Sequence, residues 1–161
     1  MNSENAQSAI TQALHEAAQA LAQLREDQQV IAKISQAAAA IEKTLSGGGR
    51  VYSCGNGGSM CDAMHFAEEL SGKFRRERRP LAAMAISDPA HMSCTANDFD
   101  FSQVFSRFIE GFGQKNDLLV AISTSGKSAN IMAAAKAARD RGMTVIALTG
   151  KPNSPDRKST R

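Results

Sequence analysis

From Arg50 onward the chain alternates short apolar segments with helical ones, and this alternation limits the possible folds more than any other feature. The expected strands are 51–54, 81–86, 118–122 and 143–148. The expected helices are 59–70, 89–97, 101–112 and 128–141. Such alternation predicts an α/β fold with a doubly wound parallel sheet, because each strand is followed by a helical crossover. Ligands of these sheets bind outside the carboxyl ends of the strands.

Two amphipathic helices are expected ahead of this core, at about 4–26 and 29–46. Each carries aliphatic residues at helical spacing, and the second ends at three consecutive glycines. A second copy of the chain is the expected partner of these stripes, because one small sheet cannot bury them both. The last residues contain no apolar side chain except proline, so they are expected to form a disordered tail. The predicted organisation is one domain, 1–161, with a helical pair at 1–46, an α/β core at 50–150 and a tail at 151–161.

The composition argues against several classes of partner. Aromatic residues make up 5% of the chain and tryptophan is absent, so stacking platforms for single-stranded nucleic acid are not expected. The net charge of +3 is too small to imply a polyanion. No apolar run approaches the roughly 20 residues that span a bilayer, and the polar N-terminus does not resemble a signal peptide. The three cysteines are read as reduced thiols, so a cytoplasmic protein with neither nucleic-acid nor membrane partners is expected.

The segment 55–59, Gly-Asn-Gly-Gly-Ser, joins the first expected strand to a helix. Its glycines let the backbone approach an anion closely, and the helix start supplies unpaired N–H groups with a favourable dipole. Ser59 could cap the helix and also donate its hydroxyl to a phosphate. A plain tight turn between strand and helix is the alternative interpretation, although it needs fewer glycines.

A second loop with similar chemistry follows the third expected strand, at 123–128. It places four hydroxyls at a helix N-terminus, on Ser123, Thr124, Ser125 and Ser128. A helix cap rich in serine and threonine would explain one or two of them. A nucleotide-binding P-loop is disfavoured because it needs glycine five residues before Gly126, where this chain has Ala121. The two loops together predict a site for a small phosphorylated ligand.

The helix after the first loop carries the residues best suited to chemistry. His65 and Glu69 are four residues apart, so they share one face and could bind one divalent metal. Glu69 could instead be the base that moves a proton between adjacent carbons of a sugar. A surface polar pair is the alternative. A zinc trio of Cys54, Cys61 and His65 is conceivable, but Cys54 ends a strand and is expected in the core.

Two further polar stretches each have two interpretations. Asn97 and Asp98 follow the second strand and either bind sugar hydroxyls or form a turn that caps the Phe101 helix. The basic run 73–79 is either a solvated loop or a guide for an anionic substrate.

These segments together resemble bacterial phosphoheptose isomerase, a family of SIS (sugar isomerase) domain proteins. The resemblance extends over nearly the whole chain, and its motifs are 53–59, 62–70, 96–99 and 121–126. It implies a flavodoxin-like fold and conversion of sedoheptulose 7-phosphate to D-glycero-D-manno-heptose 7-phosphate. This is the first step towards the ADP-heptose of the lipopolysaccharide core. It also implies a cytoplasmic homotetramer with zinc in its site.

The resemblance also implies a role for each matched residue. The phosphate would be held by Ser59 and by the second loop, through Ser123, Thr124, Ser125 and Ser128. The sugar would be contacted by Asn56, Gly57, Gly58, Asn97 and Asp98. Zinc would be bound by His65 and Glu69, and Glu69 would also be the catalytic residue that moves the proton.

Members of the family continue beyond the segment that corresponds to 148–150 with a further strand and a long helix, which bears a glutamine and a histidine. Neither His15 nor His91 matches that histidine, and the ending 151–161 looks truncated or altered. We therefore expect weak zinc binding and slow turnover. The alternatives are a non-catalytic SIS-fold protein that binds a replication initiator and a regulatory sugar-phosphate module. The acidic Glu69, which the replication-initiator subfamily lacks, favours the enzyme.

Overall fold

The computed structural model describes residues 3–150, with side chains from residue 5 onward. The predicted tail, 151–161, lies outside the described residues. The chain divides into two compact units, Met1–Ala39 and Ala40–Arg161. Two helices come first in the chain, as predicted: α1 spans Ser3–Glu26 and α2 spans Gln28–Ser46.

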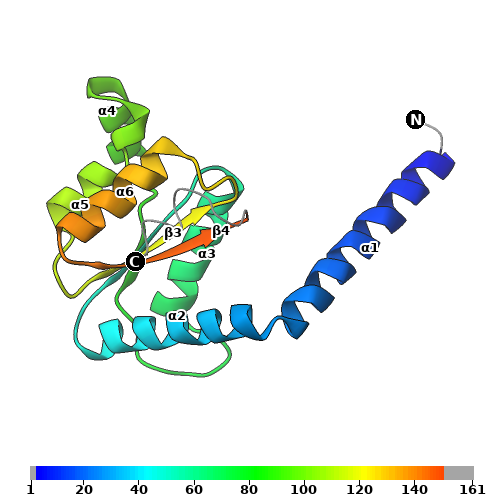
Figure 1. Ribbon diagram of the computed structural model, residues 1–161. Helices are drawn as coiled ribbons and strands as arrows, with labels where there is room; N and C mark the ends of the chain where they lie inside the picture. Colours follow the sequence, from blue (N-terminus) through cyan, green and yellow to red (C-terminus); the bar gives the residue numbers. More distant parts are fainter. Residues whose placement is uncertain (1–2, 151–161) are drawn as a thin grey trace. The chain divides into compact units, whose positions relative to one another are not determined.

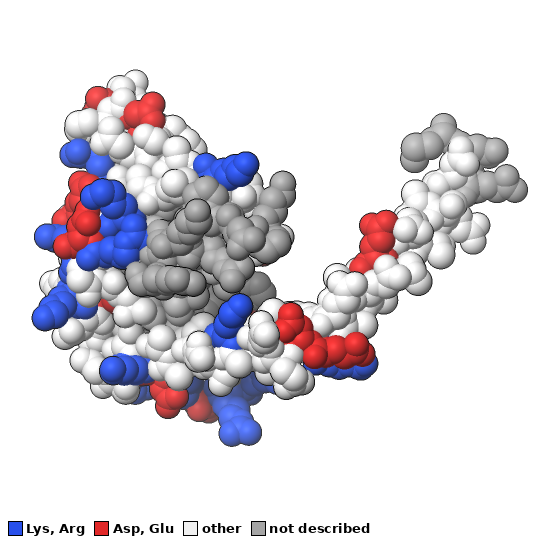
Figure 2. All heavy atoms as spheres, in the orientation of Figure 1, with Lys and Arg blue, Asp and Glu red and all other residues white. Residues whose placement is uncertain are grey.

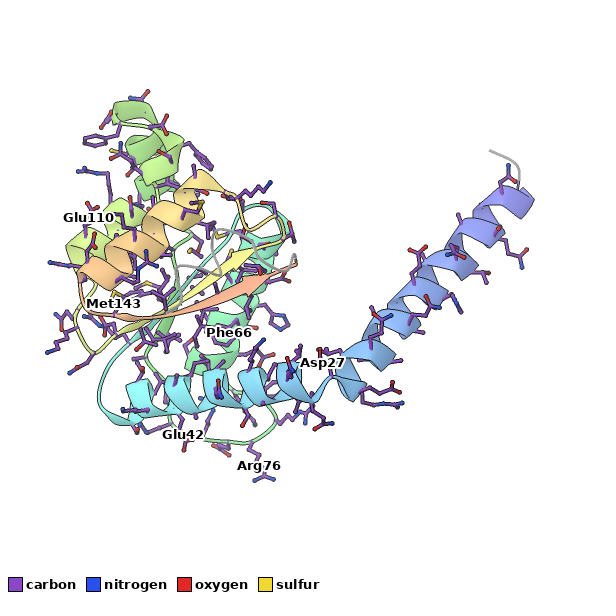
Figure 3. All side chains as sticks on the ribbon, in the orientation of Figure 1. Asp27, Glu42, Phe66, Arg76, Glu110 and Met143 are labelled. Atoms are coloured by element: carbon purple, nitrogen blue, oxygen red, sulfur yellow. The ribbon has the colours of Figure 1, made fainter. Side chains whose placement is uncertain are left out.

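The N-terminal unit consists of α1 and most of α2. Asp27, labelled in Figure 3, separates the two helices and caps α2, because its carboxylate accepts from the N–H groups of Gln29 at 2.9 Å and Val30 at 3.1 Å. The apolar residues that define the predicted stripe on α1 are exposed, with Leu14 and Leu21 each 67% accessible.

The second unit is built on a four-stranded parallel sheet with strand order β2-β1-β3-β4. Figure 1 labels two of these strands, β3 and β4. Its strands are β1 (Val51–Cys54), β2 (Ala83–Ala85), β3 (Leu118–Ser123) and β4 (Thr144–Thr149). Its helices are α3 (Gly58–Ser71), α4 (Pro89–Asp98), the 3-10 helix η1 (Phe101–Gln103), α5 (Ser106–Phe112) and α6 (Ala129–Asp140). The predicted α/β fold with a doubly wound parallel sheet is confirmed.

Helices cover both faces of the sheet, and the alternating residues of the central strands serve the two faces in turn. Tyr52 and Leu119 belong to a cluster with α5 and α6, into which Met143 also packs (Figure 3). Val51, Leu118 and Val120 form a second cluster, against which the end of α2 and Phe66 of α3 pack (Figure 3). The central strands are consequently buried on both sides, as expected of parallel strands.

Two predicted elements differ from the structure. The second strand is shorter than the predicted 81–86, because only 83–85 pair with β1. The helix predicted at 101–112 is broken into η1 and α5. A contact from α4 coincides with the break: His91 Nε2 lies 2.8 Å from the carbonyl of Val104, the acceptor that a continuous helix would offer to Phe108.

A buried carboxylate holds the amino-terminal edge of the sheet. Asp117, whose side chain is 2% exposed, accepts from the backbone N–H of Arg50 at 2.8 Å and from that of Gln114 at 3.0 Å. The guanidinium of Arg50 completes the ion pair at 3.0 Å. Residues immediately before β1 and β3 are thereby fixed to each other, which sets the register of the two central strands.

The surface of the described chain carries charges of both signs. On the face drawn in Figure 2, lysine and arginine side chains are interspersed with aspartate and glutamate. No helix within residues 3–150 has an apolar stretch long enough to cross a bilayer.

Replacing Asp117 with alanine is expected to lower the free energy of unfolding by about 3 kcal/mol, because two backbone N–H groups and the Arg50 charge would lose their partner. Urea unfolding followed by circular dichroism measures the change. Asp140→Ala, which removes an exposed ion pair with Lys136, is the matched control and should cost under about 1 kcal/mol. Equal effects of the two substitutions would contradict the assigned role of Asp117.

Candidate functional site

The two predicted loops lie next to each other at the carboxyl edge of the sheet. β1 and β3 are hydrogen-bonded neighbours, and Cys54, the last residue of β1, is in register with Ala121. The chain leaves β1 towards β2 on one side, whereas β3 and β4 lie on the other. The position between β1 and β3 is therefore the point where the strand order reverses, which is where ligands of such sheets bind.

The first loop depends on glycine at two positions. A Cβ on Gly55 would lie 2.4 Å from the carbonyl oxygen of Ser59, so only glycine allows the loop to fold back on the start of α3. Gly57 precedes α3 with a φ of 54°, in the left-handed region. Within residues 3–150 the N–H groups of Gly57 and Gly58 have no hydrogen-bond partner. They are free to bind an anion at a helix N-terminus.

Ser59 does not cap α3, contrary to one of the roles considered from the sequence. The cap position is Gly57, no side chain caps the helix, and Ser59 lies inside the first turn. The N–H of Ser59 donates to the carbonyl of Asn56 at 3.0 Å, whereas its hydroxyl makes no hydrogen bond within the described residues. The hydroxyl is thus available to a ligand.

The hydroxyls of the second loop are oriented by its own backbone. Ser123 Oγ accepts from the N–H of Gly126 at 3.1 Å, and Ser125 Oγ accepts from that of Lys127 at 3.2 Å. Accepting these bonds does not use the hydroxyl protons, since a hydroxyl can donate and accept at once. Ser128 occupies the cap position of α6 without making a capping bond, and its Oγ lies 3.4 Å from that of Ser123. A simple helix cap therefore does not account for these hydroxyls.

A pair of amides joins the two loops. Asn56 Nδ2 donates to Asn130 Oδ1 at 2.9 Å, and Asn130 Nδ2 donates to Asn56 Oδ1 at 2.8 Å. Asn130, in the first turn of α6, is only 3% exposed. It was not identified from the sequence, because an isolated asparagine near a helix start has no distinguishing pattern. The pairing explains how loops more than 60 residues apart in the chain keep a constant separation.

His65 and Glu69, which the sequence predicted to share one face, lie further along α3. His65 Nε2 lies 3.2 Å from Glu69 Oε1 and 3.7 Å from Glu68 Oε1. Glu69 is the less exposed partner, at 33% against 71% for His65. The three residues form a group whose potential ligand atoms all lie within 4.8 Å of one another. Glu68 extends the pair that the sequence predicted, since it adds a third candidate ligand.

Imidazole nitrogen and carboxylate oxygen are ligands that suit zinc, with bonds of about 2.0–2.2 Å. Two such bonds at a tetrahedral angle separate their donor atoms by about 3.3 Å. The 3.2 Å between His65 Nε2 and Glu69 Oε1 is close to that value, so these two residues fit one metal ion. The geometry supports a metal group and does not identify the metal.

Arg78 secures the end of the helix that carries this group. Its guanidinium donates to the carbonyls of Glu69 at 2.5 Å and Leu70 at 2.8 Å, which α3 leaves without helical partners. At least this member of the basic run 73–79 therefore has a structural contact, and sequence reasoning missed it because the contact joins a loop to a helix end.

Asn97 and Asp98 are the last residues of α4, so they do not cap the following helix as one interpretation held. Asp100 is the residue that caps η1, by accepting from the N–H of Ser102. The Asn97 amide donates to Asp98 at 2.8 Å, and together with the Cys94 thiol it lowers the pKa of the Asp98 carboxyl below its usual value. Asp98 therefore stays ionised and exposed, as an acceptor for hydroxyl groups.

The structure brings some of the predicted residues together and leaves others apart. The two loops are joined directly through Asn56 and Asn130. Glu69 lies ten residues after Ser59 on α3, which at a rise of about 1.5 Å per residue corresponds to about 15 Å along the helix. Within residues 3–150, no hydrogen bond connects His65 or Glu69 to either loop.

This arrangement defines a SIS domain, and a protein-family model described as SIS domain matches residues 12–150. Phosphoheptose isomerase from Sodalis glossinidius is 55% identical over 145 residues, which cover 90% of this chain and 75% of that protein. The chain belongs to the phosphoheptose isomerase family, as its motifs predicted.

Solved structures agree with this assignment. A phosphoheptose isomerase from Francisella tularensis matches with a TM-score of 0.91 and 35% identity, over 100% of this chain and 82% of that one. Phosphoheptose isomerase from Neisseria gonorrhoeae matches with a TM-score of 0.89 and 36% identity, over 96% of this chain and 80% of that one. The non-catalytic alternative is not favoured, because these relatives are isomerases.

Changing Ser123 and Ser125 together to alanine is expected to weaken the binding of inorganic phosphate at least about tenfold, because two hydroxyl donors are lost. Isothermal titration calorimetry measures the affinity, and circular dichroism verifies that the loop change leaves the fold intact. Ser46→Ala, which removes an exposed hydroxyl bonded to the end of α2, is the control and should have no effect. Unchanged phosphate affinity in the double variant would remove this loop from the binding site.

Proposed function

We propose that this chain interconverts sedoheptulose 7-phosphate and D-glycero-D-manno-heptose 7-phosphate, a ketose and its aldose. One observation carries the proposal: two loops with free donors lie side by side at the carboxyl edge of β1 and β3, and the helix leaving the first loop bears an acid–base pair. The relatives named above are phosphoheptose isomerases, which supports this reaction and this substrate.

The phosphate is bound by donors only, as its acceptor oxygens require. The hydroxyl of Ser59, in the first turn of α3, approaches it from one side. The second loop approaches from the other, through the hydroxyls of Ser123, Thr124, Ser125 and Ser128. The dipoles of α3 and α6 both favour a negative charge at their N-termini.

The sugar is bound by groups that match its hydroxyls. Asn56, Gly57 and Gly58 line the path between the loops. Asn97 and the ionised Asp98 add an amide donor and a carboxylate acceptor from the end of α4. Glu69 lies towards the far end of α3 from the phosphate donors, which fits a substrate whose reacting carbons are at the end opposite its phosphate.

Isomerisation requires one proton to move between adjacent carbons. The Glu69 carboxylate removes a proton from C1 of the ketose, and the C1–H electrons form a C1–C2 double bond while the carbonyl electrons move to O2. The protonated Glu69 then returns the proton to C2. The hydroxyl proton of O1 passes to O2 as the carbonyl forms at C1, which balances the reaction.

We assign His65 and Glu69 as zinc ligands, with Glu68 as the third ligand that the same helix offers. When bound, zinc supplies a Lewis acid that polarises the sugar carbonyl. Glu69 has two carboxylate oxygens, so one can ligate while the other accepts a proton. Structural and catalytic zinc sites usually have three or four protein ligands, so a group of three exposed or half-exposed side chains is at the lower limit and should bind zinc weakly.

The proposal includes the setting of the reaction. The enzyme acts in the cytoplasm, at the first step towards the ADP-heptose of the lipopolysaccharide core. It works as a homotetramer, and the exposed stripe on α1, with Leu14 and Leu21, supports self-association.

Glu69→Gln is expected to lower turnover of sedoheptulose 7-phosphate by about 10²- to 10⁴-fold, because the amide cannot carry the proton. The dissociation constant of the substrate should change by less than about threefold, since the side chain keeps its size. Aldose formation and calorimetry measure the two quantities. Glu42→Gln on α2 (Figure 3) is an exposed acidic control. Turnover that survives in Glu69→Gln would assign the proton transfer to another group.

Replacing Leu14 and Leu21 together by glutamate is expected to convert an oligomer of the full chain into smaller species, because charges would be buried in the contact. Sedimentation velocity at micromolar concentration measures the change. Gln19→Glu adds a charge on the opposite face of α1 and should leave the oligomer intact. A wild-type chain that sediments as a folded monomer would contradict the proposal.

A further inference from the structure

Asn130 is the most buried polar side chain between the two loops, at 3% exposure. Burying a carboxamide is unfavourable unless its donors and acceptors are satisfied. The residues of α6 that are buried with it, such as Ile131 and Ala134, are apolar. The presence of an asparagine therefore needs a reason beyond packing.

The orientation of Asn130 is determined by the backbone. The N–H of Ile131 lies 2.9 Å from Asn130 Oδ1, and a backbone N–H can only donate. The end of the Asn130 carboxamide that faces Ile131 must therefore be the oxygen, and the opposite end must be the NH₂ group. Asn130 Nδ2 then has to donate to Asn56, so the atom of Asn56 that it faces must be Oδ1.

The same logic determines what remains free on Asn56. Its Oδ1 accepts from Asn130, and one of its two Nδ2 protons is donated to Asn130 Oδ1. One Nδ2 proton is left, on a half-buried side chain next to the unpartnered N–H of Gly57. Without Asn130, the carboxamide of Asn56 could rotate and present its oxygen in place of that proton.

We propose that Asn130 is a positioning residue, which turns the carboxamide of Asn56 so that one N–H is kept for an oxygen of the bound sugar. This inference rests on the proposed function for the identity of the sugar phosphate. It adds a residue that touches no substrate and acts through Asn56. Asn130 also ties Asn56, which contacts the sugar, to α6. The N-terminus of α6 is where the second loop binds the phosphate.

Binding of two probes distinguishes positioning of Asn56 from general support of the site. Calorimetry compares sedoheptulose 7-phosphate with inorganic phosphate, in the wild-type full chain and in Asn130→Ala, Asn56→Ala and the double variant. We expect each single change to weaken the sugar phosphate about tenfold, the effect of one hydrogen bond. The double variant should be no weaker than either single one, and inorganic phosphate should change less than about twofold.

Ser106→Ala is the matched control, because Ser106 is a buried polar residue outside both loops whose hydroxyl donates to the backbone of Gln103. It should not change either affinity. Asn130→Ser is the second variant if Asn130→Ala does not fold, since serine keeps a polar group at the start of α6 and is too short to reach Asn56. Additive effects of Asn56→Ala and Asn130→Ala, or an equal loss for both probes, would overturn the proposal.

A measurement without sugar separates this inference from the proposed function. In nitrogen-15 spectra of the full chain, the side-chain amide of Asn56 is identified by its loss in Asn56→Ala. Its two protons should exchange with water at clearly different rates in the wild type, and at similar fast rates in Asn130→Ala or Asn130→Ser. Unchanged exchange would overturn the positioning role. A wild-type chain that does not turn over sedoheptulose 7-phosphate would overturn the proposed function, while the exchange rates still decide the role of Asn130.

Discussion

The parallel pairing of β1 with β3 is the constraint on which the site depends. These strands come from distant parts of the chain, and their carboxyl ends lie in register at the middle of the sheet. Each is followed by a loop and a helix, so two helix N-termini are directed at one place. No single segment could achieve this, because one helix end supplies only a few free donors.

Polar contacts maintain this pairing at both edges of the sheet. At the amino-terminal edge, buried Asp117 binds the backbone before β1 and is paired with Arg50. At the carboxyl edge, Asn56 and Asn130 bind each other. The apolar clusters between them supply most of the burial, but hydrophobic packing is not directional and would tolerate small shifts. The directional bonds are what fix the positions of donors in the loops.

The helix α3 connects the first loop to the candidate metal ligands. The N–H groups at its start have no partner in the described chain, and its later turns carry His65 and Glu69. Ser53 of β1 holds the helix by donating to the carbonyl of Ala63 at 2.8 Å, and Arg78 holds its far end. A helix held between two anchors fixes the separation between His65 and Glu69 and the N–H groups at its start, as the proposed reaction requires.

The sequence alone was sufficient for the fold class, for most helix and strand boundaries and for the residue types of both loops. These features are local: apolar periodicity, glycine content and hydroxyl spacing are all encoded within short segments. It was insufficient for the break between η1 and α5, where His91 of α4 binds the carbonyl of Val104. It was also insufficient for the contacts of Asn130 and Arg78, because each joins segments that only the folded chain brings together. Local patterns therefore determined which groups this protein offers, and the tertiary structure decided which of them are free to bind.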